Sequence, residues 1–389
     1  MKIDRRNPWH WLSLLKSGVY VLICIPLRFL FKRKAFRPLV ILYGHKLNGN
    51  LLALYRYCQS QPDHWEIHFL TLDTAYARQN PDLKPLLAVR LRDMFRVVVT
   101  ADCIVTDHGL HTLLPLLYLT HIRFVDVWHG VPFKGFIPAD FRVQHRYDEV
   151  WVSSPTLRRM YVENFGFRPG RLVATGYGRT DTLLHYYAQR ETIRRQYGIP
   201  SGRRTILFAP TWKQDDAHRT GAPFGQTMED FLARLEAVSA QHDAIIFVRH
   251  HLNAATGASL LGSDHLRALP ANRYPDTEEI LAISDCLITD WSSIAFDVMV
   301  IRKPIVFLDV PVPFKHGFAL PPDCRAGVIT TNVQQVEDAL TSILCEGTGY
   351  LGVDETEYER VRNIAFAETL DGRSSQRYHE QLGRLLTRG

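Results

Sequence analysis

The sequence predicts an α/β protein made of two doubly wound, Rossmann-like domains that face a cleft. Short apolar, β-rich runs alternate with segments of helical spacing along most of the chain. One long charged helix followed by a Pro/Ser/Gly break interrupts this series. At 389 residues the chain also exceeds one ordinary core, so two domains of roughly 150 to 200 residues are expected.

Residues 1–36 are predicted to form a membrane-associating segment. Its apolar run, 19–31, is broken by Pro26 and Arg28, flanked by tryptophans and closed by basic residues. The run is shorter than the roughly 20 residues that span a bilayer, and no small-residue cleavage site follows it. These features favour a helix lying in the membrane surface. A helix buried in the first domain and a single membrane span are the alternatives.

The first domain is expected over residues 37–190, with helical spacing in segments such as 47–58 and 156–166. Its strands are predicted at 38–44, 65–72, 103–107, 124–130, 148–154 and 171–176.

The second domain is expected over residues 191–350, after a long charged helix within 178–204. Residues 351–389 are assigned to a C-terminal helical segment. Helices are predicted at 231–241 and 336–347, and strands at 205–212, 244–251, 285–293, 304–310 and 326–331.

Composition and missing motifs exclude several classes of protein. The net charge of +6 and the pI near 9.0 suggest an anionic partner. Six scattered cysteines without a CxxC pair argue against zinc or disulfides. Neither GxGxxG, GxxxxGK[ST] nor GxSxG is present, which disfavours dinucleotide cofactors, P-loop chemistry and a serine nucleophile. We expect no metal site and no cofactor.

His129 follows an apolar run and precedes Gly130, Pro132 and Lys134. A neutral imidazole at this position could accept a proton from an attacking hydroxyl. A histidine that is only hydrogen-bonded at a strand end is the alternative interpretation.

Arg249, His250 and His251 end another predicted strand. A guanidinium beside an imidazole suits the binding of a diphosphate. Because side chains alternate along a strand, only one of the two histidines is expected to face the cleft.

Two further segments could bind phosphate. Ser292 and Ser293, with Asp297 close behind, lie between a predicted strand and a helix, where free backbone amides bind anions. An ordinary helix N-cap is the alternative. Pro210-Thr211 could add a hydroxyl, and the glycine-bracketed turn 176–179 places Arg179 at the domain edge.

Seven ordered motifs between about residue 100 and residue 377 resemble the CDP-glycerol glycerophosphotransferase family of teichoic-acid and capsule synthesis. They are WHGVPFK (128–134), YDEVWVSSP (147–155), FG…RLVATGYGRTD (165–181), ILFAPTWK (206–213), VRHH (248–251), ISDCLITDWSSIAFD (283–297) with RKPIVFLD (302–309), and DGRSSQR (371–377).

This resemblance implies a glycosyltransferase-B-like architecture at the cytoplasmic face of the cell membrane. It implies transfer of glycerol phosphate, or another polyol phosphate, from a CDP-polyol donor to a hydroxyl of a lipid-linked glycan acceptor, with release of CMP. His129 and His251 would then be catalytic. The substrate-binding residues would be Gly130, Pro132, Lys134, Arg179, Pro210, Thr211, Arg249, His250, Ser292, Ser293 and Asp297.

This chain departs from the family pattern at two places: HGTP is HGVP here, and DYSS is DWSS. Glycerol or ribitol, and single addition or polymerisation, remain open. The rival hypothesis is a glycosyltransferase of the same fold that uses a CMP- or UDP-sugar. Nucleic-acid binding is disfavoured because the basic residues are scattered rather than interleaved with aromatic residues on one face.

Overall fold

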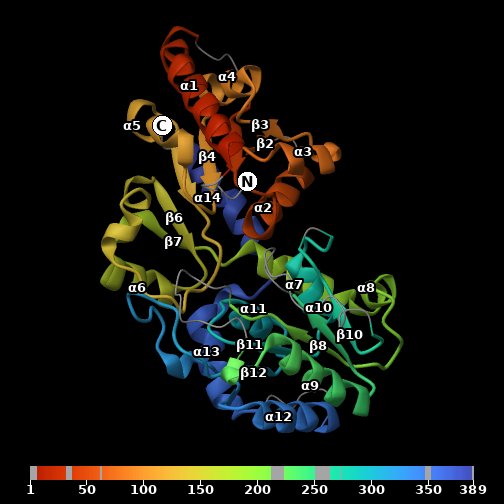
Figure 1. Ribbon diagram of the computed structural model, residues 1–389. Coiled ribbons are helices and arrows are strands. Elements are labelled where there is room, and N and C mark those ends of the chain that lie inside the picture. The colour runs from red at the N-terminus through yellow and green to blue at the C-terminus, as the bar shows by residue number, and fades with distance from the viewer. Residues whose placement is uncertain are drawn as a thin grey trace. The chain divides into compact units, whose positions relative to one another are not determined.

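The computed structural model describes residues 7–31, 37–61, 64–211, 223–249, 263–271, 273–346 and 352–387. The chain forms two compact units. The first comprises Met1–His129, Pro138–Asp181 and Asp371–Gly389, and the second comprises Gly130–Ile137 and Thr182–Leu370. Each unit is built around one sheet whose strands all pair in parallel (Figure 1), which confirms the predicted α/β class.

The first unit contains a seven-stranded sheet in the order β3-β2-β1-β4-β5-β6-β7. Its strands are β1 (Leu39–Tyr43), β2 (Glu66–Thr71), β3 (Leu86–Leu87), β4 (Cys103–Thr106), β5 (Arg123–Asp126), β6 (Glu149–Val152) and β7 (Leu172–Ala174). Its helices are α1 (Pro8–Leu30), α2 (Gly49–Ser60), α3 (Thr74–Gln79), α4 (Leu91–Thr100), α5 (Leu114–Leu119), α6 (Pro155–Phe165) and α14 (Ser374–Thr387).

Both faces of this sheet are buried. Alternate residues of β1 enter different cores: Leu39, Ile41 and Tyr43 pack with α1 and α4, whereas Val40 and Leu42 pack with α2 and α14. A strand covered on both faces needs apolar side chains on both, so it reads as a continuous apolar run.

Helix α14 closes the second of these cores. Tyr378 lies against Trp151 of β6, with ring centroids 4.9 Å apart, and Gln381 donates to the buried Glu149 at 2.8 Å. The predicted boundaries differ from this arrangement. The units divide after Asp181 rather than at residue 190, and the last residues of the chain belong to the first unit.

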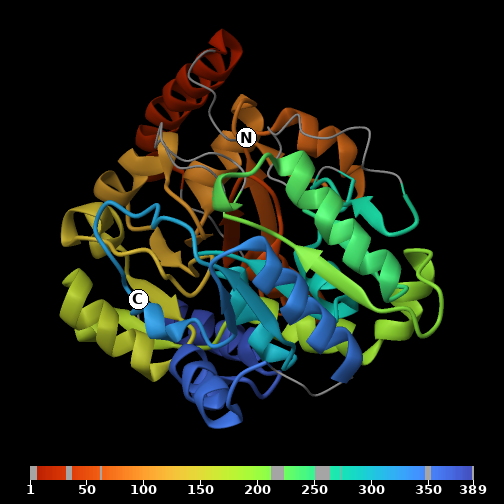
Figure 2. The ribbon, with the colours of Figure 1, turned by 60° about the horizontal axis from the view of Figure 1, so that its bottom comes forward.

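The second unit contains a six-stranded sheet in the order β10-β9-β8-β11-β12-β13. Its strands are β8 (Thr205–Phe208), β9 (Ile245–Val248), β10 (Leu266–Ala268), β11 (Cys286–Thr289), β12 (Ile305–Leu308) and β13 (Val328–Thr330). Helix α7 (Gly178–Ala188) leads into it, and the other helices are α8 (Arg190–Gln196), α9 (Met228–Gln241), α10 (Thr277–Ile283), α11 (Ile294–Val300), α12 (Val333–Glu346) and α13 (Glu355–Ala365). Helices α9 and α12 lie side by side over one face of the sheet (Figure 2).

Several predicted elements change length in the structure. The strand predicted at 124–130 ends at Asp126 because the Asp126 carboxylate accepts the Trp128 N–H at 2.7 Å and Trp128 adopts a left-handed φ of 45°. The charged helix predicted within 178–204 is two helices, α7 and α8. The short strands β3 and β10 were missed.

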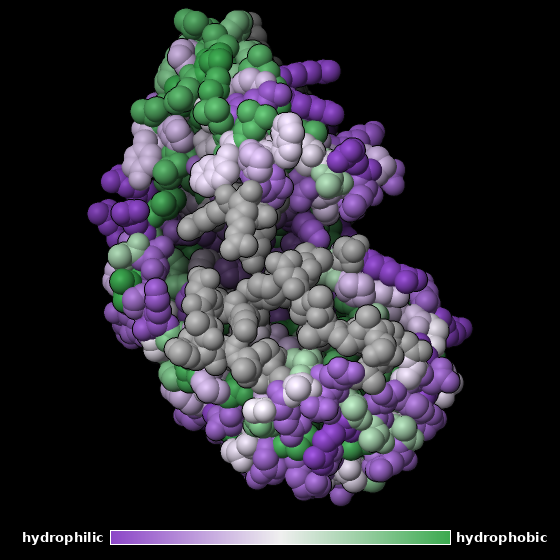
Figure 3. Space-filling model, viewed as in Figure 1, coloured by the Kyte–Doolittle hydropathy of each residue, from purple (hydrophilic) through white to green (hydrophobic). Residues whose placement is uncertain are grey.

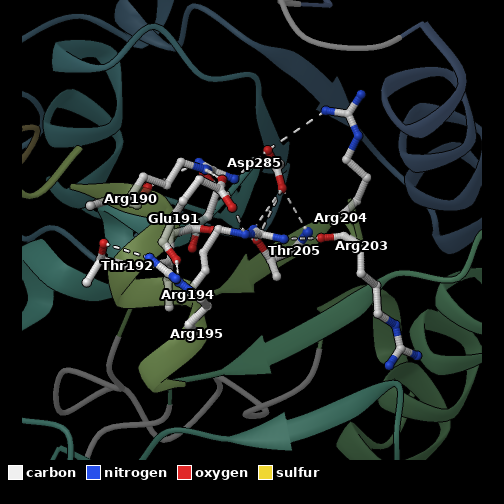
Figure 4. A network of polar contacts seen from close by, with 12 residues as sticks. Arg190, Glu191, Thr192, Arg194, Arg195, Arg203, Arg204, Thr205 and Asp285 are labelled. Atoms are coloured by element: carbon white, nitrogen blue, oxygen red, sulfur yellow. Dashed lines mark hydrogen bonds and ion pairs between the residues drawn. The ribbon is translucent and has the colours of Figure 1, made fainter. Parts of the chain in front are cut away.

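The break between α7 and α8 lets two arginines reach one buried carboxylate (Figure 4). Asp285 accepts Arg190 at 2.7 Å and the Thr205 N–H at 2.9 Å, and Arg194 lies 3.6 Å away. Asp285 precedes β11 and Thr205 begins β8, so the cluster lies at the amino edge of the sheet. Ligands of open α/β sheets bind at the opposite edge, so this cluster is structural.

Replacing Asp285 with alanine should destabilise the second unit by about 3 to 5 kcal/mol, because the variant leaves buried guanidinium groups without their carboxylate. Urea denaturation followed by tryptophan fluorescence would measure this. Glu355→Ala is the control, since Glu355 pairs with Arg302 at the surface, where a pair contributes about 1 kcal/mol or less. Equal losses in the two variants would contradict the structural role.

Candidate active site

Polar side chains gather at the carboxyl edge of the first sheet, where the strand order reverses between β1 and β4. His45 follows β1, His108 follows β4 and His129 follows β5. The centroids of the His45 and His108 rings are 5.4 Å apart, and His108 stacks on His129 at 5.0 Å with the planes 11° apart. The crevice at such a reversal is where open α/β sheets bind ligands.

The His129 ring is oriented by the main chain of the neighbouring loop. Its Nδ1 lies 3.2 Å from the carbonyl oxygen of Asp107. Because a carbonyl only accepts, this nitrogen carries the proton, and Nε2 of the neutral ring is the free base. The side chain is exposed, so Nε2 can meet a hydroxyl arriving from solvent.

His108 is oriented in the same way by the side chain of Asp107. Its Nδ1 lies 2.6 Å from Asp107 Oδ1. Both stacked rings therefore direct Nδ1 toward Asp107 and Nε2 away from it.

The two rings have opposite preferences for charge. Desolvation, then the charges of His108 and Arg179, lower the pKa of His129 to about 4, although the exposed edge of the ring lets water moderate the effect of burial. Burial also lowers the pKa of His108, but the hydrogen bond to Asp107 and the charges of Asp107 and Asp126 outweigh it and raise that pKa. His129 is therefore neutral near neutral pH, whereas the surroundings of His108 favour its charged form.

The buried side chain of Asn50, at the start of α2, holds the loop that carries His129. Its Nδ2 donates to the carbonyl oxygens of Val127 and Trp128 at 3.0 and 2.8 Å. Its Oδ1 accepts the backbone N–H of Arg179 at 3.1 Å. Arg179 in turn donates to the His129 carbonyl oxygen at 2.5 Å, so the structure brings these two predicted site residues together.

Asp126, three residues before His129, is a fully buried carboxyl. Oδ1 accepts the Trp128 N–H, whereas Oδ2 has no hydrogen-bond partner within the described ranges. Burial raises the pKa of Asp126 to about 7.

A second group of predicted residues lies in the second unit, where its strand order reverses between β8 and β11. Thr211, after Pro210 at the end of β8, donates its backbone N–H to Asp290 Oδ1 at 2.7 Å, and its hydroxyl bonds to the same oxygen. Arg249, after the adjacent β9, donates to the Tyr274 carbonyl oxygen and to Thr277 at 2.9 and 3.0 Å. Desolvation lowers its pKa. Two of its five N–H groups are engaged in these bonds.

Ser292, Ser293 and Asp297 follow the same reversal. Ser293 is the N-cap of α11 and Asp297 lies buried within that helix. Ser292 Oγ accepts the Ile294 N–H at 3.5 Å. The indole of Trp291 lies under the Arg325 guanidinium at 3.9 Å.

The segment after His129 belongs to the second unit. Gly130 and Pro132 are buried, and Lys134 forms an isolated bridge with Phe318. Phe133, between them, packs on Phe296 with centroids 4.5 Å apart. The motif 128–134 therefore does more than carry His129, because its later residues pack within the second unit.

Two predicted residues, His250 and His251, lie outside the described residues. Within the described part of the chain, no group of three or more His, Cys, Asp or Glu side chains could hold a metal ion.

Asn50, Asp107, His108 and Asp126 were not among the predicted site residues. Asp107 ends the strand predicted at 103–107 and His108 follows it, and a histidine at a strand end is the same signal that pointed to His129. Only the strand order places that pair beside His129.

The chain belongs to the CDP-glycerol:poly(glycerophosphate) glycerophosphotransferase family, whose model matches residues 28–382. It is an enzyme of this kind. It is 26% identical over 378 residues to the teichoic acid ribitol-phosphate polymerase TarK of Staphylococcus aureus, covering 90% of this chain and 69% of that protein. A structure of the wall teichoic acid polymerase TagF aligns with a TM-score of 0.72 and 19% identity, covering 97% of this chain and 98% of that one. A TagF variant soaked with CDPG aligns over the same shares of both chains, with a TM-score of 0.68 and 18% identity.

Asp126→Asn should change the pH dependence of stability. The wild-type carboxyl ionises near 3.8 when unfolded and near 7 when folded, so wild-type stability falls as pH rises through this window. Asparagine does not titrate and can still accept the Trp128 N–H. When the pH is raised from 4.5 to 8, the free energy of unfolding of the wild type should therefore fall by about 2 to 3 kcal/mol relative to that of the variant.

Urea denaturation at several pH values would measure this difference. A constant difference between the two proteins from pH 4.5 to pH 8 would contradict the buried, protonated carboxyl.

Proposed function

We propose that this chain transfers glycerol phosphate, or another polyol phosphate, from a CDP-polyol donor to a hydroxyl of a lipid-linked acceptor, releasing CMP. The product would be a teichoic-acid-like or capsule polymer made at the cytoplasmic face of the membrane. The orientation of His129 is the observation that carries the proposal. His129 is an exposed, neutral imidazole whose Nδ1 bonds to a carbonyl oxygen and whose Nε2 can accept a proton.

The chemistry requires one proton transfer and one exchange of phosphorus–oxygen bonds. The acceptor hydroxyl oxygen bonds to the phosphorus that carries the polyol, while its proton passes to His129 Nε2. The bond from that phosphorus to the bridging oxygen breaks, and CMP leaves with the electron pair. Negative charge grows on the departing phosphate, so cationic groups and hydroxyls are needed there. Arg249, Thr211, Ser292 and Ser293 are the residues that we assign to the donor.

His129→Ala should lower the rate of CMP release by about 100- to 10,000-fold, because the hydroxyl loses its base. CMP release would be measured with CDP-glycerol and with CDP-ribitol, each with a lipid-linked glycan acceptor. His121→Gln is the control, since His121 is an exposed histidine of the same unit.

A wild-type level of release by His129→Ala would contradict the role of the base. If the wild type released CMP from neither donor, CDP-polyol transfer would be contradicted, and a CMP- or UDP-sugar would be favoured as the donor.

Two features of α1 support a position on the membrane surface. Within the described residues, α1 alone is long and apolar enough to cross a membrane. Yet a stripe of Ser17, Val21, Cys24 and Ile25 is buried in the first unit. Ser17 bonds to Thr112 at 2.7 Å, and Arg28 donates to the carbonyl oxygens of Val98 and Val99 at 3.0 and 3.2 Å. A spanning helix would lose these contacts.

The opposite side of α1 is apolar and exposed. Figure 3 shows hydrophobic side chains gathered over this helix. The large aromatic and aliphatic side chains of α1 that are exposed are Trp9, Trp11, Leu12, Leu15, Val19, Leu22, Ile23, Phe29 and Leu30. Tryptophans beside leucines on one side of a docked helix suit burial in the headgroup region of a membrane.

Leu15→Glu combined with Leu22→Glu should weaken binding to anionic phospholipid vesicles by at least about 100-fold, because two leucines that the membrane would bury are replaced by carboxylates. Both side chains are exposed, so the fold should persist. Sedimentation with vesicles would measure binding, and Val312→Glu, on an exposed apolar residue of the second unit, is the control. Undiminished binding of the double variant would place the membrane contact elsewhere.

A further inference from the structure

We infer that His108, held by Asp107, is an anion-binding residue that grips a phosphate oxygen of a substrate beside His129. The inference rests on the proposed function for the identity of the substrate. The chemical class that His108 recognises is a phosphate ester, whether it belongs to the acceptor or to the donor.

The geometry of the stacked pair carries the inference. Asp107 receives Nδ1 of His108 on its carboxylate at 2.6 Å and Nδ1 of His129 on its carbonyl oxygen at 3.2 Å. The planes of the stacked rings are nearly parallel, 11° apart, and their centroids are 5.0 Å apart. Because both Nδ1 atoms bond to Asp107, both Nε2 atoms lie on the ring edges away from it.

The groups around the two rings favour the charged form of His108 and the neutral form of His129. Asp107 is 5% exposed and its carboxylate bonds to His108, which favours the imidazolium form there. The charged and titratable groups around His108 are Asp107, Asp126, His45, His111 and, through His129, Arg179. Burial lowers the pKa of His45 to about 3 and also lowers that of His111, so these two stay neutral. In this group, His108 is the ring whose Nδ1 bonds to the carboxylate of Asp107, so we assign the positive charge to it.

A cation in this position has a chemical use. An imidazolium N–H donates a charge-assisted hydrogen bond to a phosphate oxygen, whereas a protonated His129 could not act as a base. A cationic ring stacked on His129 also keeps the base unprotonated. The pair would thus bind a phosphate and accept a hydroxyl proton at adjacent points.

His108→Gln should raise the KM of one phosphate-bearing substrate by about 10- to 100-fold, as expected for the loss of a hydrogen bond to a charged group. Varying acceptor and donor separately identifies the source of the phosphate, since only the substrate that meets His108 should change its KM. His108→Lys keeps the positive charge and should recover part of the loss. His121→Gln should match the wild type.

The pH profile separates anion binding from a structural role. The kcat/KM of the wild type should fall on the alkaline side as His108 loses its proton, and this fall should move to higher pH in His108→Lys. A variant that merely loosened the loop would keep the wild-type profile at a lower level.

Direct binding is tested without turnover, so its failure is distinct from failure of the proposed function. Glycerol phosphate alone, added to protein with isotope-labelled histidines, should shift the NMR signal assigned to His108 by comparison with His108→Gln. The inference is overturned if that signal does not move, or if both KM values of His108→Gln stay within about twofold of the wild type.

Discussion

The buried side-chain amide of Asn50 is the constraint on which the first unit's site depends. Three hydrogen bonds join it to two carbonyl groups before His129 and to the amide of Arg179. Backbone groups inside a protein are costly to leave unpaired. The loop after β5 therefore has one well-satisfied conformation, in which Trp128 accepts a left-handed φ and His129 meets Asp107. The position of His129 thus follows from the hydrogen bonds that satisfy the buried backbone groups of this loop.

The second unit uses a related device at its own strand reversal. Asp290, buried after β11, receives both the amide and the hydroxyl of Thr211 from the loop after β8. In each unit a buried polar side chain ties together two loops whose strands are not consecutive in the chain. Loop residues held in this way suit phosphoryl transfer, in which positioning supplies much of the catalysis.

Much of the fold could be predicted because strands buried on both faces leave continuous apolar runs, as β1 and β11 do. His129 could be found because it follows such a run. Asn50 and His108 could not be found, since their importance depends on which strands become neighbours in the sheet. Apolar runs in the sequence do not indicate the order of the strands. The exact end of β5 was also hidden, because a side-chain cap from Asp126 stops it within an apolar segment.

The return of α14 to the first unit has a consequence for how the protein is made. Tyr378 accepts the Gly178 N–H at 3.1 Å and Ser375 donates its own to Asp181 at 2.7 Å. The ribosome delivers the whole second unit before it delivers this helix. During synthesis the first unit therefore waits with part of one face of its sheet uncovered, while the inserted unit can already close its own core. Of the two units, the one that begins first along the chain is completed last.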